Sequence, residues 1–355
     1  DLQHLPGDAQ SLELERLKVE HAQAPFDVAT GPLFKVSLVR LALNEHVLLI
    51  NVHHSIADGW SIGVLVREWA ELYRAAVSDV APELPELSVA YRDVAAWQHR
   101  WAASASAQQQ LAWWAEQLEG APALLELPTD HRRPAQQSYR GASFGRSLPA
   151  SLSKDVQQLA RSQGATVFMT LLAALNVVLQ RYSGQADVCV GTPVANRGHG
   201  HTEELVGLFV NTLVMRSRIE PEQAFSTLLA QVRHTALGAY AHQELPFERL
   251  VEHLSPERTL SHSPLFQVMF VLQNNEAAEF SLAGLRISTI EQHSTTAKFD
   301  LTLSAQETPE GLVCHWEYAT DLFSPERIER MAAHFEQVLH LVTQAPDTPV
   351  QAIEL

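Results

Sequence analysis

Cysteine is scarce in this sequence, whose 355 residues include only Cys189 and Cys314. Each lies in its own apolar run. Their spacing matches no zinc site, and two cysteines are too few for a disulfide framework. They are best interpreted as small core residues in a reducing compartment. Neither lies at a turn or a helix start, where a thiolate would be stabilised, so a catalytic cysteine is the weaker interpretation.

Positive charge is also in short supply. Lys and Arg number 25 against 41 Asp and Glu, for a formal net charge of −16. Nucleic acids and anionic membranes are bound through clustered basic side chains, so neither is an expected partner. No signal peptide opens the chain, and no apolar run reaches the roughly 18 residues of a membrane span. A cytoplasmic location is expected.

Internal repeats and glycine-rich phosphate loops are missing too, which argues against a solenoid and against a bound nucleotide. Hydrophobic residues nevertheless make up 46% of the chain. A chain of this length and composition can bury a large core as two lobes or as a pair of domains.

Helical and strand patterns alternate, which predicts a mixed α/β fold. A connector at 127–134 holds two prolines and separates two stretches of regular structure. Ser61 is expected to cap the second helix, whose apolar face would carry Ile62, Leu65, Trp69, Leu72 and Tyr73. Helices are expected at 13–23, 61–75, 105–118, 166–182 and 325–342. Strands are expected at 33–43, 46–53, 187–192, 209–215, 266–273, 299–304 and 312–318.

The segment most informative about chemistry is HHSIADG at 53–59, between a predicted strand and a predicted helix. Neighbouring strand residues point to opposite faces, so only one of His53 and His54 is expected to meet a substrate. Asp58 is able to fold back and orient the loop, and Gly59 permits a tight turn. On this motif alone, a structural pair of histidines and a metal site stay open, although no third or fourth ligand is evident.

Read together with five other segments, this motif resembles the signature of condensation domains of non-ribosomal peptide synthetases, in the chloramphenicol-acetyltransferase-like superfamily. The six matches follow the family's order over essentially the whole chain. Thr259 and His262 depart from the last motif, where the family often has Asp and Arg, and this leaves the subtype open. The five other segments are 25–33 (PFD and GPL), 91–97 (YRDVAAW), 206–212 (VGLFVNT) with Arg216, 242–248 (HQELPFE) and 258–265 (RTLSHSPL).

The resemblance implies a two-lobed, V-shaped α/β fold. Residues 1–102 would form the remaining part of the N-terminal lobe with the active-site loop, and residues 103–355 the linker and C-terminal lobe. The family's opening segment precedes the residues present here, so the N-terminal lobe would be incomplete. The closing stretch at 350–355 resembles the family's natural end.

The resemblance also implies amide-bond formation between a donor acyl or peptidyl thioester and the amine of an acceptor aminoacyl thioester. The partners would be an upstream donor carrier protein, a downstream acceptor carrier protein and an adjacent adenylation domain. The carriers supply the phosphopantetheine arms, so the domain itself would bind no cofactor and no metal.

His54 would be the catalytic residue, as a base or as a positioning group. His53 and Gly59 would be structural, and Asp58 would pair with Arg197 from the second lobe. A solvent-exposed Arg197 is the alternative. Tyr91, Asp93 and Trp97 would either line a functional surface or pack a lobe.

Related subtypes stay open as alternatives. An epimerisation domain shares the histidine motif but usually has a Ser-Trp-Arg-like run after the glycine, where this chain has Trp60, Ser61 and Ile62. A cyclising variant would carry aspartates in place of the histidines. A non-catalytic recruitment module tends to lose the active histidine. The stretches 193–197 and 258–274 resemble those of domains that accept a D-configured donor.

Overall fold

The computed structural model describes residues 1–355 apart from 199, 257–258, 274–281, 283, 289 and 291–294. By its contacts the chain divides into two units, and the division falls within helix α3 (Tyr91–Trp101). The boundary between 102 and 103 that the resemblance implies stays a prediction. Unit 1 comprises mainly Asp1–Ala95 and Arg197–Phe209, and unit 2 mainly Ala96–Asn196, Val210–Ala277 and Ser288–Leu355.

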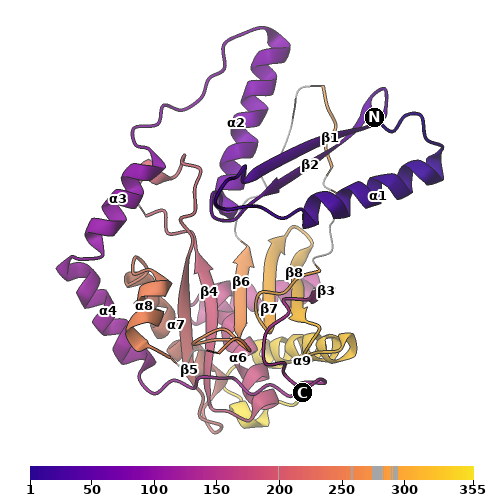
Figure 1. Cartoon of the computed structure of the whole chain (residues 1–355). Helices are drawn as coiled ribbons and strands as arrows, with labels where there is room; N and C mark the ends of the chain where they lie inside the picture. The colour runs from indigo at the N-terminus through magenta and orange to yellow at the C-terminus, as the bar shows by residue number, and fades with distance from the viewer. Residues whose placement is uncertain (199, 257–258, 274–281, 283, 289, 291–294) are drawn as a thin grey trace. The chain divides into compact units, whose positions relative to one another are not determined.

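Unit 1 is built on an antiparallel hairpin with a helix beside it (Figure 1). One face of the hairpin buries Val39 and Val47 together with Leu2 and is packed by leucines of α1. On the other face, Val36 lies opposite Ile50, and both are exposed. The elements of unit 1 are α1 (Gly7–Gln23), β1 (Phe34–Ala42), β2 (Glu45–Val52), α2 (Gly59–Ser78) and the short helix η1 (Gly200–Thr202).

Helix α2 differs from its prediction in its cap and in its buried face. The carboxylate of Asp58 accepts a hydrogen bond from the backbone N–H of Ser61 at 2.9 Å, so Asp58 is the N-cap. Ser61 lies in the first turn instead and begins the buried face, which includes Val64 and Ala75. The predicted apolar face is therefore not the buried one, and its residues Ile62 and Leu72 are exposed.

Unit 2 centres on a mixed sheet with the strand order β3-β8-β7-β6-β4-β5. The strands β4, β6 and β7 are parallel neighbours, and the other pairs are antiparallel. The strands are β3 (Gly141–Ser147), β4 (Asp187–Val194), β5 (Asn211–Arg218), β6 (Val268–Gln273), β7 (Leu301–Thr308) and β8 (Gly311–Ala319). The helices are α4 (Ala105–Leu118), α5 (Ala150–Ser162), α6 (Val167–Ser183), α7 (Phe225–Ala241), α8 (Phe247–Leu254) and α9 (Pro325–Gln344), followed by η2 (Val350–Ala352).

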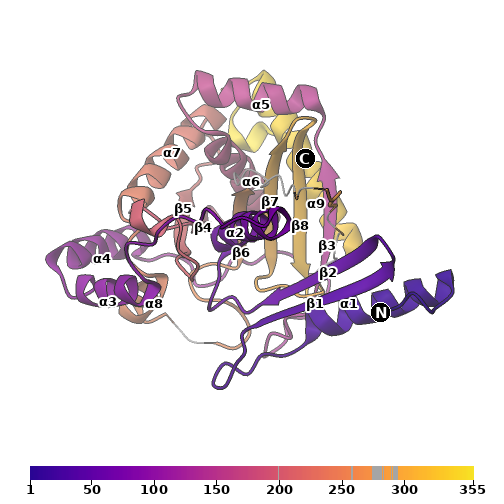
Figure 2. The ribbon, with the colours of Figure 1, turned by 90° about the horizontal axis from the view of Figure 1, so that it is seen from above.

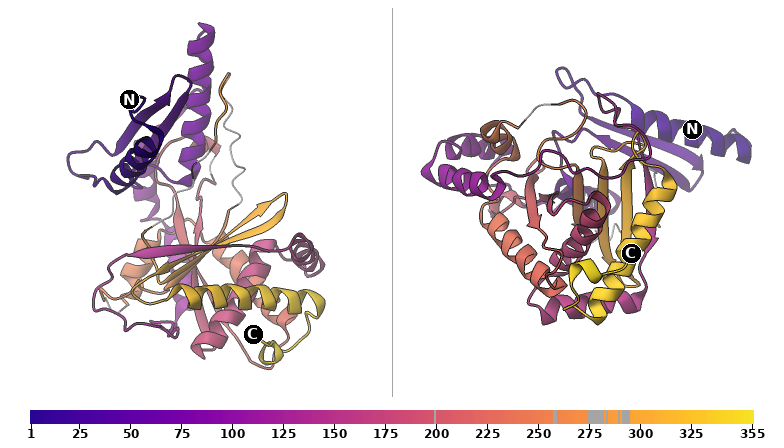
Figure 3. Two further views of the ribbon diagram at one scale, coloured as in Figure 1. Left: turned by 90° about the vertical axis from the view of Figure 1, so that its right-hand side faces the viewer. Right: turned by 90° about the horizontal axis from the view of Figure 1, so that it is seen from below.

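Helices α5, α6, α7 and α9 gather on one face of this sheet (Figure 2). In the left view of Figure 3, α9, in yellow, lies on the same side of the sheet as the C-terminus. Helix α6 is the centre of the core, where every residue from Phe168 to Leu179 is buried. Both cysteines are free and buried in this core, as predicted, and burial raises the pKa of each thiol to about 12.

The mixed α/β class is as predicted, and α4, α6, α9 and the central strands lie where expected. Several described elements of unit 2 were not expected, among them β3, α5, α7 and α8. Among the described residues no single helix is long and apolar enough to cross a membrane. Helices α5 and α6 meet that test only as a pair, by length and composition, across a bend of 105°.

The core of unit 2 is tested by a matched pair of leucines. Leu339 on α9 is fully buried, whereas Leu237 on α7 is 49% exposed. Leu339→Ala is expected to lower the free energy of unfolding by about 2–5 kcal/mol, since it leaves a cavity in a packed core. Leu237→Ala is expected to change it by less than about 0.5 kcal/mol. Urea unfolding measures both, and equal losses would contradict this description of the core.

Candidate active site

The histidine motif lies in the turn that joins β2 to α2. Strand β2 ends at Val52, so neither histidine continues the strand and the expected alternation across it does not apply. The turn is held by two backbone hydrogen bonds, from His53 N–H to the carbonyl of Leu33 at 2.9 Å and from Ile56 N–H to the carbonyl of His53 at 3.1 Å. The two imidazoles are distinguished by their hydrogen bonds.

His54 is exposed, and its ring contacts the backbone of the same turn. Its Nδ1 lies 3.0 Å from the carbonyl oxygen of Ala57. A carbonyl only accepts, so Nδ1 carries the proton in this contact. In the neutral ring, Nε2 then holds the lone pair. His54 therefore has the tautomer that a base acting through Nε2 needs.

His53 has the opposite pattern. Its Nδ1 accepts from the backbone N–H of Ser55 at 3.2 Å and lies 2.7 Å from the hydroxyl of Ser55. The Phe26 ring packs nearly perpendicular to the half-buried imidazole, with the ring centroids 5.8 Å apart. These contacts hold the turn and fit the structural role expected for His53.

Asp58 and Arg197, 139 positions apart in the sequence, form a buried ion pair. Arg197 Nη2 lies 2.9 Å from Asp58 Oδ1, and the two side chains are 3% (Asp58) and 2% (Arg197) exposed. Arg197 Nη1 donates to the carbonyl of Leu205 at 2.8 Å, and the guanidinium lies 4.0 Å from the centre of the Phe209 ring. The exposed alternative for Arg197 is therefore wrong.

The expected location of this pair needs a correction. The resemblance placed Arg197 on the second lobe, but by its contacts the segment Arg197–Phe209 belongs to unit 1, together with Asp58. The physical reason lies in this segment's hydrogen bonds. Besides the ion pair, Phe209 N–H donates to Asp58 Oδ2 at 2.9 Å, and Asp58 N–H donates to the carbonyl of Gly207 at 3.1 Å.

The ionised form of Asp58 is stabilised by these partners. Burial raises the pKa of the carboxyl group, because the charged form is removed from water. Hydrogen bonds from the backbones of Phe209 and Ser61, the Ser61 hydroxyl and the charge of Arg197 act in the opposite direction. Together they outweigh burial, and the pKa of Asp58 lies below its ordinary value.

Gly59 does not have the role expected of it. Its φ lies outside the left-handed region, and a Cβ atom at this position would meet only open space. The turn therefore does not require a glycine for its backbone. Gly59 is the first residue of α2, five residues beyond His54, and the space beside it is open.

Tyr91 and the stretch 206–209 meet in unit 1. The Tyr91 hydroxyl donates to the carbonyl of Leu208 at 2.9 Å. The Tyr91 ring packs perpendicular to the Phe209 ring, with the ring centroids 5.3 Å apart. A Cβ atom on Gly207 would lie 2.2 Å from the Tyr91 ring, so only glycine permits this approach. Tyr91 therefore packs against the segment that holds Asp58.

Two further motifs of unit 2 bind backbone groups. Asn211 donates to the carbonyls of Gln243 and Leu245 at 2.8 and 2.7 Å, and its side-chain oxygen accepts from Phe247 N–H at 3.0 Å. Arg216 binds Asp187 through two nitrogens and donates to the carbonyls of Gln117 and Glu119 at the end of α4. Both residues serve the architecture.

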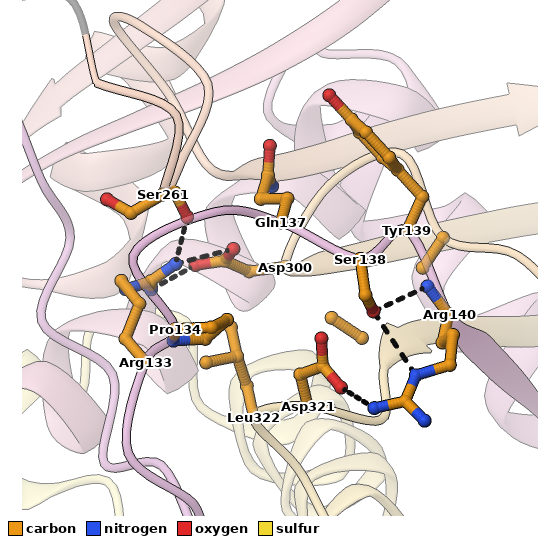
Figure 4. Close-up of a pocket in the computed structure, with 12 residues that line it drawn as sticks. Arg133, Pro134, Gln137, Ser138, Tyr139, Arg140, Ser261, Asp300, Asp321 and Leu322 are labelled. Carbon is orange, nitrogen blue, oxygen red and sulfur yellow. Dashed lines mark hydrogen bonds and ion pairs between the residues drawn. The ribbon is translucent and has the colours of Figure 1, made fainter.

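The last motif begins at Arg258, which lies outside the described residues, as does Asn274 at the end of the stretch compared with D-accepting domains. The carbonyl of Ser261 accepts from Arg133, whose guanidinium also forms an ion pair with Asp300 beside a small pocket (Figure 4). On the other side of this pocket, Arg140 pairs with Asp321. Each arginine there has a carboxylate partner.

One site residue was predicted only as a helix cap. Ser61 is fully buried, and its hydroxyl contacts Asp58, Arg197 and Gly207. The available signal was its position three residues after Asp58, the spacing between a helix cap and the N3 position. No group of three or more His, Cys, Asp or Glu side chains suited to a metal ion occurs in the described part of the chain.

A double-mutant cycle tests the ion pair. Asp58→Asn or Arg197→Met alone is expected to lower the free energy of unfolding by about 3–5 kcal/mol, because the remaining charge is buried without its partner. The double variant is expected to lose less than the sum of the two single losses. Strict additivity in chemical unfolding would refute the pair.

Comparison with known proteins identifies the family. The family model for condensation domains matches residues 1–355. The chain is 48% identical over 357 residues to one of the proteins that make up the linear gramicidin synthase of Brevibacillus parabrevis, a match that covers 100% of this chain and 7% of that protein. The chain therefore spans less than a tenth of that relative's length.

Solved structures agree with this match. The X-domain from teicoplanin biosynthesis superposes with a TM-score of 0.90 at 26% identity, over 96% of this chain and 79% of that one. A four-domain nonribosomal peptide synthetase bound to AMP and glycine superposes with a TM-score of 0.85 at 25% identity, over 100% of this chain and 27% of that one. The predicted mixed α/β class and condensation-domain fold are confirmed, and the chain belongs to the condensation-domain family of nonribosomal peptide synthetases, a family of acyltransferases.

Proposed function

We propose that this domain joins a donor acyl or peptidyl thioester to the amine of an acceptor aminoacyl thioester. The observation that carries the proposal is the hydrogen bond from His54 Nδ1 to the carbonyl of Ala57 in an exposed turn. It leaves Nε2 with a lone pair for the acceptor amine. Upstream and downstream carrier proteins present the two substrates on their phosphopantetheine arms, and an adenylation domain is the expected neighbour.

The reaction follows from these groups. The acceptor nitrogen attacks the donor thioester carbonyl, and His54 Nε2 takes or orients the proton that the nitrogen loses. The C–N bond forms, the C–S bond breaks, and the departing sulfur takes up a proton. The products are the elongated acyl chain on the acceptor carrier and a free thiol on the donor carrier. No metal or redox step enters this balance, and the reaction is expected in the cytoplasm.

Two other functions fit the same fold. Epimerisation would move a proton at one carrier-bound α-carbon and would need a single carrier. A recruitment module would bind another enzyme without chemistry, and the X-domain of teicoplanin biosynthesis is known in a complex with OxyB. The intact His54 and its hydrogen bond favour catalysis over recruitment.

Removing the imidazole tests the catalytic role. His54→Ala is expected to lower kcat by about 10²–10⁴-fold, the range for loss of a general base. The measurement is amide formation with donor and acceptor carriers loaded with aminoacyl groups. His53→Ala is the matched control and is expected to lower the melting temperature, since its ring holds the turn. Turnover near that of the wild type by folded His54→Ala protein would overturn the catalytic role.

We propose further that the donor residue has the D configuration. The support is the likeness of 193–197 and 258–274 to the corresponding stretches of D-accepting domains. A binding site next to the thioester excludes one configuration of the donor residue when a substituent of that configuration clashes with the wall of the site.

The donor's configuration is tested by loading the upstream carrier with peptidyl groups that end in either a D or an L residue. Faster product formation from the D-ended donor is expected, with the acceptor held constant. A preference for the L-ended donor would overturn the stereochemical proposal and leave amide formation intact.

A further inference from the structure

Ser61 is fully buried in the first turn of α2, and its hydroxyl oxygen has four polar neighbours. Asp58 Oδ1 lies at 2.7 Å and the carbonyl oxygen of Gly207 at 2.8 Å. Arg197 Nη2 lies at 2.8 Å and the backbone N–H of Gly207 at 3.0 Å. The hydroxyl therefore touches both members of the ion pair and the segment that follows Arg197.

These neighbours use the whole bonding capacity of a hydroxyl group. A serine oxygen accepts two hydrogen bonds and donates one. The N–H groups of Arg197 and Gly207 fill the two acceptor positions, and the single proton goes to Asp58 or to the carbonyl of Gly207. An alanine at this position would leave the buried N–H of Gly207 without this acceptor.

Helix capping does not account for this arrangement. In a capping box, the side chain at N3 reaches back to the backbone N–H of the N-cap residue. Here the N-cap is Asp58, and its N–H donates to the carbonyl of Gly207 at 3.1 Å instead. The Ser61 side chain is directed to Arg197 and Gly207, both more than 130 positions away in the sequence.

The link from this cluster to the imidazole is short. Ala57 directly precedes Asp58, and its carbonyl oxygen accepts the hydrogen bond from His54 Nδ1. Asp58 is held by its own N–H, by Phe209 N–H and by Arg197. A shift of Asp58 therefore moves the carbonyl that selects the tautomer and the orientation of His54.

We propose that Ser61 is a positioning residue. Its hydroxyl holds Arg197 and Gly207 in their contacts with Asp58 and thereby fixes the orientation of the His54 ring for reaction. The inference rests on the proposed function and adds to it a residue that touches no substrate. Binding of either carrier is therefore independent of Ser61, and only the geometry of the reacting group depends on it.

Kinetics of Ser61→Ala test the proposal against a matched control. Ser153 is also a buried helix serine, in unit 2, whose hydroxyl accepts from Leu312 N–H at 2.8 Å. Ser61→Ala is expected to lower kcat about 10- to 100-fold, as for a slightly misplaced catalytic group, with the KM for both carriers unchanged. Ser153→Ala is expected to leave kcat unchanged. An equal kcat in the two variants, measured well below both melting temperatures, overturns the proposal.

A spectroscopic measurement keeps this test separate from that of the proposed function. Nitrogen-15 NMR of the imidazoles reports the tautomer of His54, whose signals are assigned by their loss in His54→Gln. The wild type is expected to show the Nδ1-protonated form, and Ser61→Ala a mixture of the two tautomers. An unchanged His54 signal in Ser61→Ala overturns the positioning role even where wild-type turnover is high. A changed signal supports that role even where His54→Ala still turns over and the proposed function fails.

Discussion

The buried carboxylate of Asp58 has to be compensated, because an ionised group removed from water without partners is very costly. Its partners are Ser61 in α2 and Arg197 and Phe209 in a segment about 140 positions later. Satisfying one charge therefore ties three stretches of chain together. The geometry of the loop that carries His54 therefore depends on the hydrogen bonds that compensate the Asp58 charge. A buried pair of this kind is better regarded as fixing an arrangement than as adding net stability.

The sequence predicted the elements whose own residues carry a strong pattern. Helix α6 is apolar over most of its length and begins after Thr166, whose hydroxyl caps it. Strand β3, by contrast, has the sequence GASFGRS and little strand propensity. It is a strand because it pairs with β8 along its length. Such an element is decided by a distant partner, which periodicity does not report.

The same distinction separates the predicted from the unpredicted parts of the site. The motif named His53, His54 and Asp58, and the resemblance named Arg197. Ser61 was assigned to capping, because spacing within one helix was the only information about it. Its contacts with Arg197 and Gly207 span more than 130 residues. The strand end at Val52 was misplaced by one residue, which is enough to remove the alternation argument for the two histidines.

The motif residues fall into two groups by where their polar atoms are directed. Asn211, Arg216 and Arg197 donate to backbone carbonyls, and Asp58 accepts from backbone N–H groups, so these side chains hold loops in place. His54 uses one ring nitrogen in the same way, on the carbonyl of Ala57, and its ring is nevertheless exposed. A residue that served the architecture alone would gain by burying its ring, as His53 partly does against Phe26. The exposure of His54 is what the proposed reaction at its other nitrogen requires.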